Sequence, residues 1–200
     1  MVRFSGIFTT GVAGSSQVIG IGSAGDGFFF GFNGVDFGVL RRQGGVHEIR
    51  SLQITTKSTT AENITITLDG DADVTVPVTD ATAGDATTTA NDIAAHDYSG
   101  LGRGVQAVAV GDTVNFISYC AAPYTGTYSL SGATTAVGTF SIKLSGVAPT
   151  DTWTAQTLWN HDKFDGAGAS GVTLDPTKGN VYQIKYQWLG YGQISFFIEH

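Results

Sequence analysis

The sequence predicts a mainly β protein: a jelly-roll-like β-sandwich with an inserted small α+β module that contains one short helix. Three observations support this fold class. The 200 residues include 28 glycines and many threonines but one methionine, a composition that favours strands and tight turns over helices. Short apolar runs alternate with polar residues at the period of two that strands require. Aromatic residues are concentrated in the first and last parts of the chain.

The first part of the chain, residues 1–52, predicts a meander of strands joined by tight turns. Glycines separate its short apolar runs, which lie at residues 17–22, 28–32 and 37–40. Asn33-Gly34 stands between the last two runs and is a common two-residue hairpin turn. We therefore expect consecutive strands here to pair as hairpins.

The pattern G-x-G-x-x-G occurs at residues 20–25. In a dinucleotide-binding site a helix follows this pattern, and the N-terminus of that helix binds the pyrophosphate. In this chain another strand-like run, residues 28–32, follows instead. We therefore interpret residues 20–25 as a flexible hairpin loop, and the sequence predicts no cofactor.

The middle part, residues 53–150, predicts a threonine-rich ββαββββ module. Apolar and polar residues alternate over 64–68 and 74–78, which indicates a hairpin around an Asp69-Gly70 turn. One helix follows, with Asp85 as its N-cap and Ser99-Gly100 at its end. The four later strands are expected at residues 105–110, 114–119, 128–130 and 140–144.

The last part, residues 151–200, ends in a strongly patterned hairpin. Tyr182, Ile184, Tyr186 and Trp188 share one face of its first strand, and residues 190–192 form its turn before a strand at 194–198. Because the first and last parts share an aromatic-rich composition, residues 1–52 and 151–200 are expected to form one discontinuous sandwich. The module at 53–150 is then an insertion at a loop tip, where insertions are tolerated. Both ends of the chain are strand-like, so we expect a segment of a longer polypeptide.

Charge and hydropathy exclude several classes of partner. A formal net charge of −7 disfavours nucleic acid, which requires clustered Lys and Arg. Arg41 and Arg42 are adjacent and would point to opposite faces of a strand. The longest apolar run, residues 28–32, is too short to insert into a membrane. The single cysteine, Cys120, rules out an internal disulfide, and its strand-like surroundings predict a half-buried structural thiol.

The densest group of titratable residues is His161-Asp162-Lys163-Phe164-Asp165. A hydrolase can use a histidine with an aspartate, but adjacent side chains diverge and no serine or cysteine stands in a nucleophile context. We interpret this segment, with the glycine-rich residues 166–171, as a loop stabilised by Asx-type hydrogen bonds. The sequence therefore predicts no catalytic residues and no enzyme.

A second acidic group, Asp69, Asp71 and Asp73, has the alternation found in calcium-binding loops. The later glycine and the bidentate glutamate of an EF-hand are missing, so a solvated hairpin turn is the preferred interpretation. These three aspartates stay weak candidates for binding a cation, and no metal site is predicted.

Aromatic residues on exposed strands can bind sugars or other proteins. On the last hairpin we expect them to be core, because large aromatic side chains dominate core burial. Trp153, Trp159 and Tyr191 lie outside that face pattern and are the candidate interaction surface.

The run from Trp159 to Lys178, with 181–184 and 187–190 after it and 27–40 near the start, resembles a family of β-rich virion structural proteins. These proteins occur in tailed phages and large DNA viruses. The middle module is similar to a threonine-rich domain of phage tail and fibre proteins. The resemblance extends over nearly the whole chain and supplies no catalytic residues.

Residue patterns and resemblance together predict a viral structural protein located in the virion, as a capsid-decoration, fibre or tail component. We expect it to act by self-assembly, for instance as a trimer, and by contacts with other virion proteins. The alternative is an adhesin that binds a host surface glycan. A depolymerase is disfavoured because the paired carboxylates of glycoside cleavage are missing.

Overall fold

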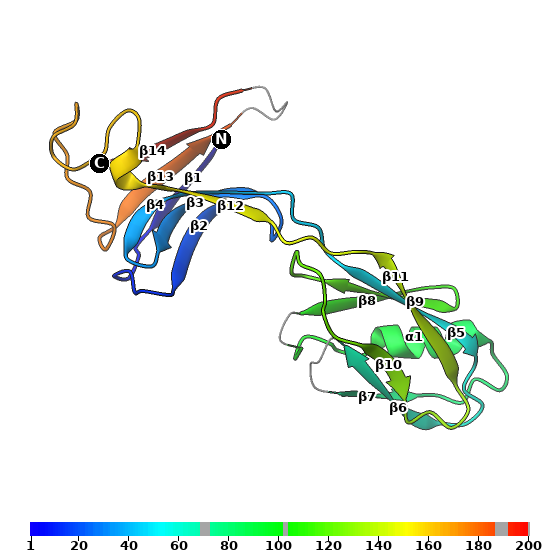
Figure 1. Ribbon diagram of the computed structural model, residues 1–200. Helices are drawn as coiled ribbons and strands as arrows, with labels where there is room; N and C mark the ends of the chain where they lie inside the picture. Colours follow the sequence, from blue (N-terminus) through cyan, green and yellow to red (C-terminus); the bar gives the residue numbers. More distant parts are fainter. Residues whose placement is uncertain (69–72, 102–103, 187–191, 200) are drawn as a thin grey trace. The chain divides into compact units, whose positions relative to one another are not determined.

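The structure is a computed structural model that describes residues 1–68, 73–101, 104–186 and 192–199. These residues are mainly β and form several sheets and one α-helix. The chain divides into two compact units: residues 1–44 with 150–200, here the sandwich unit, and residues 45–149, here the inserted module (Figure 1). Each unit has its own apolar core.

The first boundary between the units differs from the prediction. It lies between residues 44 and 45, not between 52 and 53. The reason is β5 (Ile49–Thr56), a strand that the sequence pattern did not reveal and that pairs with two strands of the inserted module. Leu52 and Ile54 of β5 are buried in the module core, whereas its first residues lack a clear alternation.

The sandwich unit consists of two antiparallel sheets that pack face to face (Figure 1). The four-stranded sheet has the order β12-β4-β3-β2, with strands β2 (Ser16–Gly22), β3 (Gly27–Asn33), β4 (Asp36–Gln43) and β12 (Thr150–Ala155). The three-stranded sheet has the order β1-β13-β14, with strands β1 (Val2–Gly6), β13 (Asn180–Lys185) and β14 (Ser195–Glu199). A short 3₁₀ helix, η1 (Gln156–Leu158), follows β12.

Both sheets contribute to one aromatic core, as the composition of the first and last parts predicts. The ring of Tyr182 in β13 lies 4.9 Å from that of Phe30 in β3, and both side chains are fully buried. Phe8, after β1, lies 5.8 Å from Tyr182. The antiparallel pairing of β13 with β14 confirms the last hairpin, whose turn begins outside the described residues. The jelly-roll connectivity stays a prediction.

Two loops in the sandwich unit confirm the hairpin interpretation of the glycine signals. Asn33 pairs with Asp36, so the two-residue turn is Gly34-Val35, one residue later than the expected Asn33-Gly34. Gly34 has the left-handed φ of +63° that such turns need. Residues 23–26 connect β2 to β3, so the G-x-G-x-x-G pattern ends in a hairpin loop. Within that loop the Ser23 hydroxyl accepts hydrogen bonds from two backbone N–H groups.

The inserted module also has two sheets, ordered β11-β5-β9-β8 and β10-β6-β7. Its further strands are β6 (Glu62–Leu68), β7 (Val74–Val78), β8 (Val105–Val110), β9 (Thr113–Ser118), β10 (Tyr128–Ser131) and β11 (Val137–Leu144). Pairing of β6 with β7 confirms the expected hairpin, whose turn lies outside the described residues. The predicted order of strands and helix is present, with β5 preceding it.

The helix of the module, α1 (Ala86–Ala95), begins where the sequence predicts and ends earlier. The Asp85 carboxylate accepts a hydrogen bond from the backbone N–H of Thr87 and caps the helix. The helix ends at Ala95 rather than near Ser99. Tyr98 is nevertheless buried, and its hydroxyl donates to the carbonyl of Ile93. Because Tyr98 is buried although it lies past the end of the helix, the apolar pattern predicted a longer helix than the structure contains.

Helix α1 fills the space between the two sheets of the module on one side. It contacts the edge strand β7 of one sheet and the edge strand β8 of the other. On the opposite side β10 lies close to β11. Within the described part of the chain, no helix has the length and apolarity needed to cross a bilayer.

Candidate interaction groove

The sandwich unit has a groove of about 680 Å³ on the side of its edge strands β12 and β14. Thr154 of β12 and residues 195–198 of β14 line it. The remaining wall is largely apolar and aromatic, formed by Phe30, Val39, Trp159 and Phe164. Asn160, His161, Asp162 and Gln193 add polar groups, of which the Asp162 carboxylate is charged. The groove is therefore an apolar recess with a mixed rim.

Trp159 is held in the wall of the groove by local hydrogen bonds and by ring contacts. Its Nε1 donates to the carbonyl of Thr154 at 3.4 Å, and its backbone N–H donates to the carbonyl of Gln156 at 3.1 Å. Its ring lies 6.5 Å from that of Phe30 and 6.2 Å from that of Phe164. The side chain stays half-buried, so one part of the indole is available to a bound partner.

The loop after Trp159 is organised by Asp162, which confirms the Asx-type interpretation. One carboxylate oxygen accepts from the backbone N–H of Phe164, and the other accepts from that of Ser170, both at 2.8 Å. These hydrogen bonds, that of Ser170 first, hold the pKa of Asp162 below its usual range. The Asp162 carboxylate therefore stabilises the loop backbone, although the neighbouring His161 would make it a candidate for catalysis.

Phe164 adopts an unusual backbone conformation that turns its ring toward the groove. Its φ is +51°, the one left-handed non-glycine residue among those described. Its carbonyl accepts hydrogen bonds from the backbone of Leu174 at 2.8 Å and from the side-chain amide of Gln156 at 3.3 Å. Such contacts are what keeps a strained backbone in place, and strain of this kind concentrates at functional surfaces.

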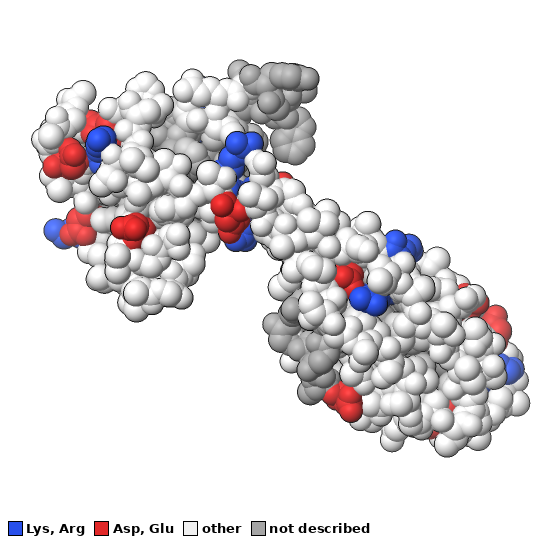
Figure 2. Space-filling view, in the orientation of Figure 1, with Lys and Arg blue, Asp and Glu red and all other residues white. Residues whose placement is uncertain are grey.

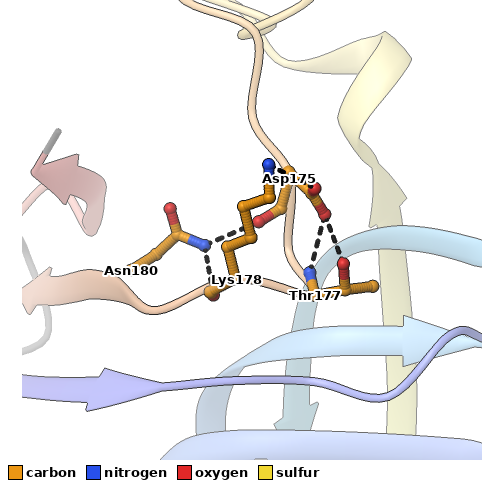
Figure 3. Close-up of polar contacts among 4 residues, drawn as sticks. All are labelled: Asp175, Thr177, Lys178 and Asn180. Carbon is orange, nitrogen blue, oxygen red and sulfur yellow. Dashed lines mark hydrogen bonds and ion pairs between the residues drawn. The ribbon is translucent and has the colours of Figure 1, made fainter.

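A polar turn leads from this loop into β13 (Figure 3). The Asp175 carboxylate accepts from the backbone N–H and the hydroxyl of Thr177, at 3.0 and 2.6 Å. The Asn180 amide donates to the carbonyls of Asp175 and Lys178, both at 2.8 Å. This turn therefore fixes where β13 begins, and so where its partner β14 lies.

Trp153, the second tryptophan of the expected surface, points away from the groove. It precedes Thr154, and successive side chains of a strand face opposite sides. Its ring lies over Gly38, where an added Cβ would be 3.0 Å from its Cζ2. The structure thus does not bring Trp153 and Trp159 together. Tyr191 lies outside the described residues.

The acidic candidates for a cation do not form a site in the described residues. Asp73 accepts a hydrogen bond from the Thr67 hydroxyl at 2.7 Å, while Asp69 and Asp71 lie outside the described residues. No group of three or more His, Cys, Asp or Glu side chains is placed to hold a metal in residues that the structure describes. Cation binding by these aspartates stays an alternative to the expected solvated hairpin turn.

Cys120 corrects another expectation. The sequence predicts a half-buried thiol in a strand, whereas Cys120 is exposed and lies beyond the end of β9. The strand ends at Ser118, whose hydroxyl accepts from the backbone N–H of Cys120 and donates to its carbonyl. A serine that bonds its local backbone in this way competes with the strand ladder.

Two partly or fully buried glutamates of the inserted module were missed by sequence reasoning. The Glu62 carboxylate accepts from the backbone N–H groups of Thr134, Thr135 and Ala136, at 2.6 to 3.2 Å. Glu48 is 2% exposed, pairs with Arg50 and accepts from the backbone N–H of Tyr124 at 2.9 Å. Both carboxylates fasten loops to strands. Nothing in the sequence marks these loop contacts, because the backbone N–H groups that the carboxylates bind lie more than 70 residues away along the chain.

Charged side chains are sparse and mixed in sign on the face shown in Figure 2. Arg41 is exposed, whereas Arg42 forms a bidentate pair with Asp151. The two arginines therefore do not join into a basic patch.

Comparison of the chain with models of protein families, with curated proteins and with solved structures found no match.

Proposed function

We propose that this chain is a structural protein of a virus particle, a decoration, fibre or tail component, that works through contacts with other protein chains and without catalysis. The observation that supports this most is the groove along β12 and β14, an apolar and aromatic recess bordered by two strand edges. Such a recess suits a polypeptide, because apolar side chains and free strand edges are what protein interfaces use.

The state of the neighbouring polar groups supports the same proposal. His161 and Asp162 are the pair of side chains most suited to catalysis by type. The Asp162 carboxylate, however, accepts hydrogen bonds from the backbone of its own loop. The glutamates of the inserted module are likewise bound to backbone N–H groups. These side chains therefore stabilise loops. That the chain is part of a virus particle is proposed from its resemblance to virion proteins.

The alternative is an adhesin that binds a host glycan, and one observation favours it. Trp159 stands in the groove beside the polar side chains of Asn160 and His161. An aromatic ring flanked by hydrogen-bonding groups is suited to a sugar, whose faces are apolar and whose edges are polar.

Three measurements distinguish these functions. We expect light scattering after size exclusion to show a stable oligomer at micromolar concentration, and antibodies against the chain to label virus particles from its source in electron micrographs. A glycan array should give no signal. A monomer that binds a glycan, and loses that binding on Trp159→Ala but not on Trp153→Ala, would establish the adhesin instead.

A further inference from the structure

The two sheets of the sandwich unit have different numbers of strands, and the additional strand of the larger sheet lies beside the groove. Four strands face three. On one side the sheets end together, because β1 lies close to β2. On the other side β12 is the additional strand of the four-stranded sheet. Among the described residues, no strand of the three-stranded sheet lies beyond β14 to cover it. The groove occupies this position.

The groove runs along the backbone edge of β14 and not along one face alone. The four consecutive residues 195–198 all line it. Successive side chains of a strand point to opposite faces, so consecutive contacts mean that the groove follows the edge of the strand. Among described residues β14 pairs with β13 alone, and its other edge therefore offers unpaired N–H and C=O groups.

The size of the groove matches one more strand. β14 has five residues. A strand of that length, at about 3.3 Å per residue, 4.8 Å from its neighbour and 10 Å from the facing sheet, fills roughly 800 Å³. The groove measures about 680 Å³.

The inserted module shows how this chain treats the corresponding space elsewhere. There the side between edge strands β7 and β8 is filled by α1, which buries Ala90 and Ile93 in the core. In the sandwich unit the corresponding side is covered in part by Trp159 and Phe164 and is otherwise open. An apolar recess of this kind is stabilised by any segment that buries it.

We propose that the groove binds one extended segment of a different protein, not of a second copy of this chain, and that this segment adds to β14 as an antiparallel fourth strand. The segment alternates apolar side chains, directed at Phe30 and Val39, with polar side chains directed outward. Main-chain hydrogen bonds to β14 give affinity, and the aromatic recess selects the apolar positions. Every strand pair described in this unit is antiparallel, so we expect the added strand to be antiparallel too. This inference rests on the proposed function and specifies its partner.

The test supplies the missing strand from the chain itself. Two versions of the full chain are extended after His200 by an Asn-Gly turn and six residues, either Thr-Val repeated three times or Val-Thr repeated three times. The two extensions have the same composition, but a shift of one residue exchanges the faces of a strand. All three tryptophans lie in residues 150–200, so tryptophan fluorescence follows the sandwich unit.

We expect one extension to raise the unfolding midpoint of the sandwich unit by roughly 4–8 °C, and the other to leave it within about 1 °C. Thr154→Arg places a long side chain in the groove and should abolish the gain. Thr152→Arg, at an exposed position on the same strand and face, should preserve it. Equal effects of the two extensions, or of the two arginines, would overturn the proposal.

A second measurement tests the proposal even if the extended chains do not fold. The same six-residue strands are added as free peptides to the unextended chain, and hydrogen exchange is measured at residues 195–199. Protection by one peptide alone supports strand addition. If neither peptide protects β14, and Thr154→Arg instead dissolves an oligomer or removes a glycan signal, the occupant is a second copy or a sugar and the proposal is wrong. Antibody labelling of virus particles does not depend on these results, so it tests the proposed function separately from strand addition.

Discussion

Arg42 and Asp151 form a bidentate ion pair across β4 and β12, the strands through which the chain leaves and re-enters the sandwich unit. Nε and one terminal nitrogen of Arg42 donate to the two carboxylate oxygens of Asp151, at 2.8 and 2.7 Å. The two residues are direct partners in the strand register. The hydrogen bond from Arg42 holds the pKa of Asp151 below its usual range. The pair therefore fastens the base of the insertion.

Asp151→Asn should destabilise the sandwich unit slightly. Both side chains are partly exposed, at 28% and 43%, so we expect a loss of about 1 kcal/mol or less in the free energy of unfolding. The loss should shrink in high salt, which screens exposed charges. Urea unfolding followed by tryptophan fluorescence measures it, with the exposed Arg41→Gln as control. An equal loss in both variants would contradict a specific role for the pair.

Glu62→Gln should destabilise the inserted module by roughly 1–3 kcal/mol, because a charged acceptor of several hydrogen bonds is lost. The glutamine amide can point an N–H₂ group at the N–H donors of residues 134–136, which leaves some of them unsatisfied. Calorimetry and hydrogen exchange of residues 134–136 measure the effect. Glu199→Gln, in the sandwich unit, is the control and should leave this exchange unchanged.

Acid should weaken the inserted module through the same carboxylates. Desolvation by burial raises the pKa of Glu62, but hydrogen bonds from Thr134, Ser58 and Ala136 outweigh it and hold the pKa well below the ordinary 4.5. The pKa of Glu48 is also lowered. A lowered folded-state pKa stabilises the fold above the unfolded pKa, and this stability is lost as the pH falls toward the folded value.

We therefore expect a constant stability of the module from pH 7 to about 5 and a progressive loss below that. A calorimetric series over pH measures the loss, and in Glu62→Gln the slope should be shallower. Identical slopes for the two proteins would show that Glu62 is not responsible.

Gly168→Ala should disrupt the loop beside the groove. A Cβ at this position would lie 2.2 Å from Oδ1 of Asp162, closer than any real contact, so the hydrogen bonds from Phe164 and Ser170 would have to break. We expect faster proteolysis of residues 160–174 and altered fluorescence of Trp159. Gly179→Ala, where an added Cβ meets nothing within 4 Å, is the matched control. A loop that resists protease equally in both variants would refute this.

The alternation of apolar and polar residues predicted most of the paired strands. The hairpins of β6 with β7 and of β13 with β14 follow from period-two patterns, since a strand with one buried face must repeat that way. The cap at Asp85 was predictable because it depends on residues close in sequence. Strands β5 and β12 were missed because neither has a clear alternation of apolar and polar residues. The end of α1 was placed too late because burial across the module includes Tyr98, which lies beyond the helix.

What the sequence determined by itself is therefore local: the mainly β class, the hairpins, the helix start and the turn at Gly34. The tertiary structure alone decided which strands became edges and which loops closed over them. The groove is made by β12, β14 and the loop after Trp159, and Glu62 finds its partners at residues 134–136. Such sites depend on pairs of residues distant along the chain, whereas a sequence pattern reports on one segment and the face it buries.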